Sequence, residues 1–296
     1  MTAQSPVADG LVVVDKPAGW TSHDVVARTR KLAGTRRVGH AGTLDPMATG
    51  VLVLGIGKAT RLLGHLALTD KAYDATIQLG VTTVTDDADG EPVSTTPTGH
   101  VDDAAIGSAV SALTGDISQV PSSVSAIKVD GERAYKRVRD GDTVELAARP
   151  VTVSVFAVRA TRRTADVIDL DVTVECSTGT YVRALARDLG AALGVGGHLT
   201  ALRRTRVGPY ELAEAHTLEA LEKSFALLPI ADAVRVAFPV REVDAEQARV
   251  LGHGGPLPAL GLADGPVAVL GPDGTFLALV EERNGLAKPV AVFVGP

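Results

Sequence analysis

Cysteine is almost absent from this sequence, because Cys176 is the only one among 296 residues. An intramolecular disulfide therefore cannot form, and no cluster of thiolates is available to bind a structural zinc ion. Long apolar runs are absent as well: no stretch is long enough to cross a bilayer, and residues 1–10 lack the basic start and apolar core of a signal peptide. We expect a cytoplasmic protein with a flexible tail at residues 1–9 and with no requirement for a metal or cofactor.

Positive charge is also scarce, with 29 Lys and Arg residues against 35 Asp and Glu residues and a net charge of -6. This balance alone argues against a nucleic-acid partner, because neutralised phosphates supply most sequence-independent affinity. The basic residues are concentrated, however: the stretch from Arg28 to Arg61 contains a single acid, Asp45. One such cluster is typical of a solvated surface, but several favour an anionic partner. The others lie at residues 133–139, 159–163 and 203–206.

The length and the 45% hydrophobic content allow one large domain and a second, smaller one. Ile168, Leu170 and Val172 alternate with Asp169 and Asp171, which is typical of a half-buried strand. The patterns predict an α+β fold with a mixed, mainly antiparallel sheet, followed by a small C-terminal β domain. Predicted strands are residues 11–14, 50–57, 73–79, 151–158 and 167–174, predicted helices are 21–32, 58–68, 102–113 and 181–193, and 86–99 is predicted to be a loop.

Three motifs that would indicate other chemistry are incomplete. Gly50–Gly55 has the glycine spacing of a phosphate-binding loop, but Ile56 stands where the lysine must follow. His23, His40 and His65 do not combine with a plausible third ligand at metal-binding spacing. A polar turn with several serines lacks the sharp strand-to-helix turn that exposes a nucleophilic serine. The sequence thus gives no support for a P-loop protein, a metal site or a serine hydrolase.

The acid Asp45 lies within a glycine-rich stretch, residues 38–50. Its glycines allow positive φ angles or close backbone approach, and Pro46 disfavours helical geometry at the residue before it. We therefore expect Asp45 to be held on a rigid loop between two strands. The spacing alone leaves open a simple Asp-Pro turn with no chemical role.

The segment GHAGTLDPMATG at residues 39–50 closely resembles the motif that carries the nucleophilic aspartate in TruB-type pseudouridine synthases. The resemblance continues in the order found in that family and covers about residues 11–212. Its further blocks are DKPAGWTS at 15–22, DKAY at 70–73, DDADG at 86–90, CSTGTYVR at 176–183 and GHLTALRRT at 197–205.

The resemblance implies a catalytic domain at residues 10–230, a thumb insertion at about 126–149 and a small PUA-like β domain at 231–296. It also implies the isomerisation of uridine to pseudouridine at position 55 in the T loop of tRNA, after the base has been flipped out. The expected partner is the T stem-loop of tRNA; no protein partner is implied, and a monomer is expected. No atoms enter or leave in this reaction, which agrees with the expectation that no cofactor is needed.

Position by position, the resemblance implies that Asp45 is the catalytic nucleophile. Tyr73 would stack on the target base, and Arg183 would pair with the aspartate in the closed site. Tyr181 and Leu202 would line the uracil pocket. The carboxylate could act as a nucleophile at the sugar or as a base in a glycal route, and the sequence does not distinguish the two.

Other positions would support the loop and bind RNA. His40 would help to place the flipped nucleotide, and Lys16 with Pro17 would support the catalytic loop. Val124 departs from the family, which usually has an aromatic residue or Met there, so a packing contact at the base of the thumb is in doubt. The expected RNA-binding residues are Lys128, Arg133, Lys136, Arg137, Arg203 and Arg204.

Two other functions remain to be weighed. A tRNA-binding or folding factor could use the basic clusters without catalysis, although every catalytic position carries the residue that the family has there. A nucleoside hydrolase normally needs two carboxylates about 5–10 Å apart, and no second acid lies near Asp45 in the sequence. Release of free uracil would support the hydrolase.

Overall fold

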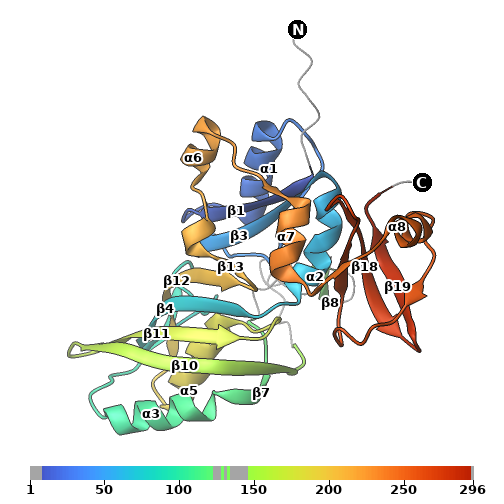
Figure 1. Ribbon diagram of the computed structural model, residues 1–296. Coiled ribbons are helices and arrows are strands. Elements are labelled where there is room, and N and C mark those ends of the chain that lie inside the picture. Colours follow the sequence, from blue (N-terminus) through green and yellow to red (C-terminus); the bar gives the residue numbers. More distant parts are fainter. Residues whose placement is uncertain (1–8, 123–127, 130–131, 134–145, 295–296) are drawn as a thin grey trace. The chain divides into compact units, whose positions relative to one another are not determined.

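The structure, a computed structural model, contains two compact units (Figure 1). Each is described by itself. Residues 1–8 of the predicted tail, Val124 and most of the predicted thumb, including Lys136 and Arg137, lie outside the described residues. The first unit comprises residues 1–45, 50–68 and 207–296, and the second comprises 46–49 and 69–206. The described residues are 9–122, 128–129, 132–133 and 146–294.

Two buried strands form the centre of the first unit. Strand β1 (Gly10–Lys16) pairs antiparallel with β3 (Thr49–Ile56) along its whole length. Successive side chains of a strand point to opposite faces, so Val12 and Val13 enter two different core clusters. Burial on both faces explains why these strands are almost continuously apolar. Both predicted strands are confirmed. Two short strands extend the pairing, namely β2 (Val38–Ala41) on β3 and β14 (Leu228–Pro229) on β1.

Helix α1 (Ser22–Leu32) begins at a complete capping box. The Thr21 hydroxyl accepts a hydrogen bond from the Asp24 backbone N–H at 3.1 Å, and the Asp24 carboxylate accepts one from the Thr21 N–H at 2.9 Å. These two bonds satisfy donors that would otherwise lack a partner at the helix start. The predicted helix is confirmed, with Thr21 as its N-cap.

The helix predicted at residues 58–68 differs from the prediction at its start. The chain first forms a 3-10 helix, η1 (Gly57–Leu62), and only then the short α-helix α2 (Leu63–Ala67). The Thr60 hydroxyl donates to the Gly57 carbonyl at 2.8 Å. This bond spans three residues, as the backbone bonds of a 3-10 turn do, and favours the tighter winding there.

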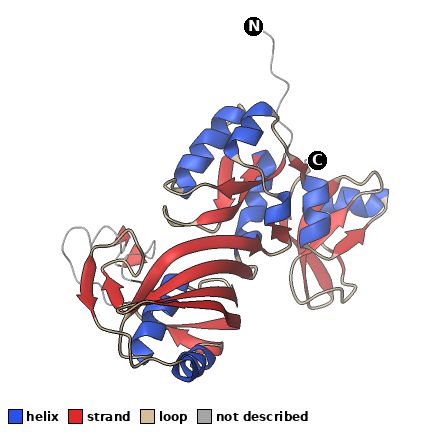
Figure 2. Cartoon of the chain, turned by 90° about the vertical axis from the view of Figure 1, so that its left-hand side faces the viewer, coloured by secondary structure: helices blue, strands red, loops and turns tan. Residues whose placement is uncertain are grey.

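The second unit is built on an antiparallel sheet whose two faces differ (Figures 1 and 2). In β11, alternate residues from Ile168 to Cys176 are buried, and the residues between them are partly exposed. The predicted alternation is confirmed. The buried face packs against helices α3 (Asp103–Ala112) and α5 (Val182–Ala192). The strands follow the order β12 (Gly197–Val207), β4 (Lys71–Leu79), β11 (Ile168–Cys176), β10 (Arg149–Arg163) and β7 (Gly115–Gln119).

The segment predicted to be a loop at residues 86–99 is partly a strand. β6 (Pro92–Thr95) pairs antiparallel with β5 (Val81–Thr83), and the hydroxyls of Thr82 and Ser94 lie 2.7 Å apart. The prediction was wrong here because β6 is exposed at all four residues, so no apolar alternation marks it. In the thumb region the structure describes one short pairing, β8 (Lys128–Val129) with β9 (Glu132–Arg133).

The C-terminal part forms a five-stranded sheet of its own, in the order β15-β17-β18-β19-β16. This confirms the predicted small β domain. No helix in the described part of the chain is long and apolar enough to cross a membrane. The remaining elements are β13 (Tyr210–Glu211), η2 (Leu212–Glu214), α6 (Leu218–Lys223), α7 (Ile230–Ala237), β15 (Val240–Glu242), α8 (Ala245–Gly252), β16 (Leu257–Pro258), β17 (Val267–Leu270), β18 (Phe276–Arg283) and β19 (Leu286–Val292).

Helix α5 lies so close to the start of β12 that only glycine fits at the contact. A Cβ atom at Gly190 would lie 2.1 Å from the carbonyl carbon of Gly196 and 2.2 Å from the nitrogen of Gly197. We expect Gly190→Ala to destabilise the protein by about 3 kcal/mol, because backbone atoms cannot move aside as a side chain can. Gly107→Ala in α3 is the matched control. Its added methyl would meet nothing within 4 Å, so it should stabilise by about 0.5–1 kcal/mol. Urea unfolding of both variants measures the difference, and equal midpoints would contradict this account of the packing.

Candidate functional site

The loop that carries Asp45 runs from β2 to β3 and is held by a serine from α1. The Ser22 hydroxyl donates to the carbonyl of Leu44 at 3.1 Å and accepts from the N–H of Leu44 at 2.9 Å. Ser22 and Leu44 are both buried, and Asp45 itself is half-buried. One side chain therefore fixes both polar backbone atoms of the residue before the aspartate. The sequence analysis placed Ser22 at the end of the DKPAGWTS block and at the start of a predicted helix, and it missed this contact.

Lys16, at the end of β1, is fully buried. Its ammonium donates to the carbonyl of Pro17 at 3.0 Å and to that of Trp20 at 2.6 Å. These bonds close the turn that leads into α1, whose first residue is Ser22. Lys16 thus shapes the segment that presents Ser22 to the loop. This position agrees with the expected support of the catalytic loop, which stays a prediction.

His40 lies on β2 and is half-buried. Its ring meets the ring of His23 edge to face, with the centroids 5.6 Å apart. His23 lies in the first turn of α1. The contact orients the imidazole of His40 on the strand that precedes the Asp45 loop.

Arg183 lies in the first turn of α5 and is 4% exposed. Its Nη1 donates to the carbonyl of Thr85 at 2.7 Å, and its Nε lies 3.5 Å from Oδ2 of the buried Asp87. The other carboxylate oxygen of Asp87 accepts from the backbone N–H of Asp89 at 3.1 Å and from the Thr85 hydroxyl at 2.5 Å. The DDADG block was noted in the sequence as a family feature, but no role was assigned to Asp87. The structure shows that it holds the guanidinium.

Tyr181 precedes α5, and a buried glutamine holds its backbone. Gln119 Nε2 donates to the carbonyl of Tyr181 at 3.1 Å, and Gln119 Oε1 accepts from its N–H at 2.8 Å. Gln119 is 1% exposed, so these two bonds satisfy its amide in the interior. Nothing in the local sequence around Gln119 signals this contact.

Tyr73 on β4 and Leu202 on β12 belong to neighbouring strands of the second unit. Both side chains are almost buried. In β4, Tyr73 shares the buried face with Ala75 and Ile77, opposite to the face of Asp74. Tyr73, Leu202 and Tyr181, which are predicted to contact the base, all lie in the second unit.

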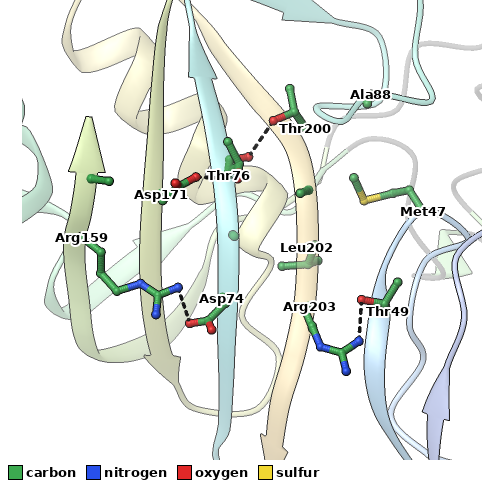
Figure 3. A pocket seen from close by; sticks show the side chains of 13 residues that line it. Met47, Thr49, Asp74, Thr76, Ala88, Arg159, Asp171, Thr200, Leu202 and Arg203 are labelled. Carbon is green, nitrogen blue, oxygen red and sulfur yellow. Dashed lines mark hydrogen bonds and ion pairs between the residues drawn. The ribbon is translucent and has the colours of Figure 1, made fainter. Parts of the chain in front are cut away.

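A pocket of about 670 Å³ opens on the second unit, and Figure 3 shows its lining. Leu202 and Arg203 contribute to it, and so does Met47, which is two residues from Asp45 in the chain. At one side of the pocket, Arg203 donates to the hydroxyl of Thr49 at 3.2 Å. The opposite side is polar: Arg159 pairs with Asp74 at 3.0 Å, and Thr76 donates to Asp171 at 2.8 Å.

The predicted RNA-binding residues fall into four groups. Arg203 lines the pocket and is half-buried. Arg204 is only 1% exposed, so the expectation that it contacts RNA is corrected. The error arose because adjacent residues of a strand point to opposite faces, and sequence reasoning treated both as one basic cluster. Lys128 and Arg133 are paired in the β8–β9 ladder, and Lys136 and Arg137 lie outside the described residues.

The first unit supplies one loop carboxylate, and the second supplies a buried arginine and a lined pocket. In the part of the chain that the structure describes, no group of three or more His, Cys, Asp or Glu side chains is placed to hold a metal ion. A carboxylate on a fixed loop can attack an electrophilic carbon or accept a proton. A buried guanidinium favours the ionised form of a carboxylate that comes into contact with it.

Comparison with known families covers nearly the whole chain. The model described as "TruB family pseudouridylate synthase (N terminal domain)" matches residues 30–182. The model "tRNA pseudouridylate synthase B C-terminal domain" matches residues 183–233, and "tRNA Pseudouridine synthase II, C terminal" matches residues 238–294.

Individual relatives match over most of their lengths. The chain is 61% identical to the tRNA pseudouridine synthase B of Thermobifida fusca, over 98% of this chain and 100% of that protein. It is 63% identical to that of Nocardia farcinica, over 96% and 92% of the two chains. A solved Cbf5-Nop10-Gar1 complex matches with a TM-score of 0.74 at 26% identity, covering 98% of this chain and 86% of that one. An H/ACA RNP bound to a substrate RNA containing 2′-deoxyuridine matches with a TM-score of 0.71 at 25% identity, covering 99% and 92%.

The bonds between Ser22 and Leu44 generate a stability prediction. We expect Ser22→Ala to lower the free energy of unfolding by about 1–3 kcal/mol, because it removes a hydrogen-bond partner from two buried backbone atoms. Ser108→Ala is the matched control, since the Ser108 hydroxyl makes one exposed bond to Ala104 in α3; its effect should stay within about 0.5 kcal/mol. Denaturant unfolding of the two variants measures both changes in the free energy of unfolding. If Ser22→Ala left this free energy unchanged, the loop would not depend on the contact.

Proposed function

The chain belongs to the TruB family of pseudouridylate synthases, and from this premise we propose that it modifies the uridine at position 55 in the T loop of tRNA, with Asp45 as its nucleophile. The broader activity follows from the relatives: the chain is a tRNA pseudouridine synthase with the mixed α+β fold of that family. We also propose that it acts without a protein partner and in the cytoplasm, where tRNA is available.

The Asp45 loop is the observation that carries the proposal. It has the sequence GHAGTLDPMATG and contains one acid. The bonds from Ser22 fix Leu44, the residue before that acid. On its other side, the chain continues to Met47, which lines the pocket of the second unit. A nucleophile gains most when it is held in one orientation, because the cost of ordering it is met during folding.

The reaction moves the bond between the ribose C1′ and the uracil from N1 to C5. No atoms are gained or lost. In the nucleophilic route, the Asp45 carboxylate bonds to C1′ while the C1′–N1 bond breaks, and the electron pair remains on N1. The uracil anion rotates, C5 bonds to C1′ and the carboxylate leaves. The proton on C5 is then lost to a base, and N1 gains a proton. In the glycal route the same carboxylate instead removes the proton on C2′ while the C1′–N1 bond breaks, which leaves a C1′–C2′ double bond and the uracil anion. C5 then bonds to C1′ and the proton returns to C2′, so both routes balance without a cofactor.

Arg183 would supply positive charge to this chemistry. We propose that it pairs with Asp45 in the closed site. Its burial and its bonds to Asp87 and the carbonyl of Thr85 support this role, because a preorganised guanidinium need not be ordered during the reaction. Contact with a guanidinium favours the carboxylate in its ionised, nucleophilic form.

The target uridine must leave the folded loop before it can react, at a cost of a few kcal/mol. We propose that Tyr73 stacks on the flipped base, which offsets about 1–3 kcal/mol of that cost. Tyr181 and Leu202 would line the uracil, and His40 would place the nucleotide. The fixed backbone of Tyr181, held on both sides by Gln119, is consistent with a pocket that keeps one shape.

Asp45→Asn tests the proposal directly. The amide keeps the size of the carboxylate without its charge, so we expect tRNA binding and stability to be preserved and turnover to fall below detection. Chemical mapping of pseudouridine in unmodified tRNA, with assay of free uracil, measures the outcome. Asp264→Asn, an exposed position in the C-terminal part, is the matched control. Activity of Asp45→Asn within tenfold of wild type would refute the assignment, and release of free uracil would indicate a hydrolase.

A separate prediction concerns how the protein binds RNA. We propose that the thumb, with Lys128, Arg133, Lys136 and Arg137, and the pocket residue Arg203 contact tRNA phosphates. Affinity should then fall steeply with salt, by about 0.7 to 0.9 in the log–log slope for each neutralised phosphate.

Neutralising Lys136 and Arg137 together should reduce that slope by about one to two units and change the rate of the bound complex much less. The matched control neutralises two exposed cations of the C-terminal part, Arg249 and Lys288, and uses a minimal T-arm hairpin as ligand. If the Lys136 and Arg137 variant kept the wild-type slope, tRNA would bind elsewhere on the protein.

A further inference from the structure

Two arginines of α5, Arg183 and Arg187, both contact the segment that follows β5. Arg183 donates to the carbonyl of Thr85 and pairs with Asp87. Arg187 pairs with the residue between them, since its Nη1 lies 3.5 Å from Oδ2 of Asp86. Residues four apart in a helix lie on the same face. One face of α5 therefore holds three consecutive residues, 85–87, whereas the proposed reaction uses only Arg183.

The backbone at Asp86 is in the left-handed region, with a φ of 59°. This conformation costs energy for residues other than glycine and persists where the surrounding structure holds it. In an extended segment the side chains of Asp86 and Asp87 would point to opposite sides, but here both reach α5. The carbonyl of Asp86 accepts a hydrogen bond from the N–H of Leu199 in β12 at 3.0 Å. The strained residue is thus held by β12 at its carbonyl and by Arg187 at its carboxylate.

The guanidinium of Arg187 is itself fixed by two other groups. The Asp188 carboxylate lies 2.8 Å from both Nε and Nη2, and Nη2 also donates to the carbonyl of Val120 at 2.7 Å. Val120 directly follows Gln119, whose amide holds the backbone of Tyr181. Arg187 therefore ties the segment at 85–87 to the end of β7, close in the chain to the residue that fixes the expected base pocket.

The two adjacent carboxylates, Asp86 and Asp87, have different arginines as partners. Burial raises the pKa of the Asp86 carboxyl above its ordinary value, while Ser122 and the charges of Arg187 and Arg183 oppose that rise. The charge of Arg183 thus acts on Asp86 as well as on Asp87. Without Arg187, Asp86 would compete with Asp87 for the guanidinium of Arg183.

We propose that Arg187 is a positioning residue for the isomerisation: it holds Asp86 in its left-handed turn and so keeps Asp87 on the guanidinium of Arg183. The proposal rests on the proposed function, in which Arg183 pairs with Asp45. A guanidinium that shifts toward Asp86 is displaced from the geometry needed at the nucleophile, and small displacements of a reacting group lower rates strongly. Arg187 acts through other residues and does not need to touch the RNA.

The test measures single-turnover rates on unmodified tRNA, with enzyme in saturating excess, and tRNA affinity separately. Arg187→Gln should be about tenfold slower with unchanged affinity, because it removes the charge that holds Asp86. Asp86→Asn keeps the size of the side chain and tolerates the left-handed conformation, so it should fold and be about threefold slower. If the two act as one pair, the double variant should be no slower than Arg187→Gln, whereas independent effects would multiply to about thirtyfold.

Arg235→Gln is the matched control, since Arg235 on α7 is exposed and lies 3.5 Å from its partner Glu242; its rate should equal that of wild type. A partly unfolded sample would lower the amplitude of the reaction and not its rate constant, and thermal unfolding checks this. A wild-type rate in Arg187→Gln, a wild-type rate in Asp86→Asn, or multiplied losses in the double variant would overturn the proposal and leave the function intact. Failure of wild type to form pseudouridine would instead overturn the function.

Discussion

The guanidinium of Arg183 and the carboxylate of Asp87 lie 3.5 Å apart in the interior of the second unit. A charge in such a place is tolerated only when opposite charge and hydrogen bonds replace the water that it has lost. Arg183 also donates a hydrogen bond to the carbonyl of Thr85, and Asp87 also accepts one from the N–H of Asp89. The start of α5 is therefore tied to the segment after β5. Tyr181, which precedes α5, is fixed in turn by Gln119.

The sheet of the second unit separates two kinds of polar group. On its partly exposed face, Asp74, Thr76 and Asp171 bond to arginines and hydroxyls across neighbouring strands, and solvent weakens each of these pairs. Lys71, on the buried face of β4, lies in an interior where a charge acts over a longer range. A polar group on the first face contributes mainly to stability and to the pocket lining.

The acidic net charge and the anionic substrate are compatible because charge is distributed unevenly along the chain. Arg28 to Arg61 contain one acid, whereas residues 86–91 contain four. Phosphates respond to the local field of a surface and not to the net charge of the whole protein. Buried members of the basic clusters do not contribute as phosphate contacts, as Arg204 shows, so exposure must be known before a cluster can be counted.

The sequence by itself determined the secondary structure of the sheet and the identity of the loop. The alternation that predicted a strand at residues 167–174 is local, and a local pattern needs no knowledge of distant residues. The Asp45 loop could be identified because its motif is continuous. Strand β6 escaped prediction because an exposed strand carries no apolar period.

Only the tertiary structure decided how the supporting contacts are made. Ser22 and Leu44 are 22 residues apart, Gln119 and Tyr181 are 62 apart, and Arg183 and Thr85 are 98 apart. Nothing in the residues between such partners encodes the pairing, because it arises only when strands and helices pack. The same holds for Arg203 and Arg204. They are adjacent in β12 and point to opposite faces, so one is half-buried at the pocket and the other is fully buried.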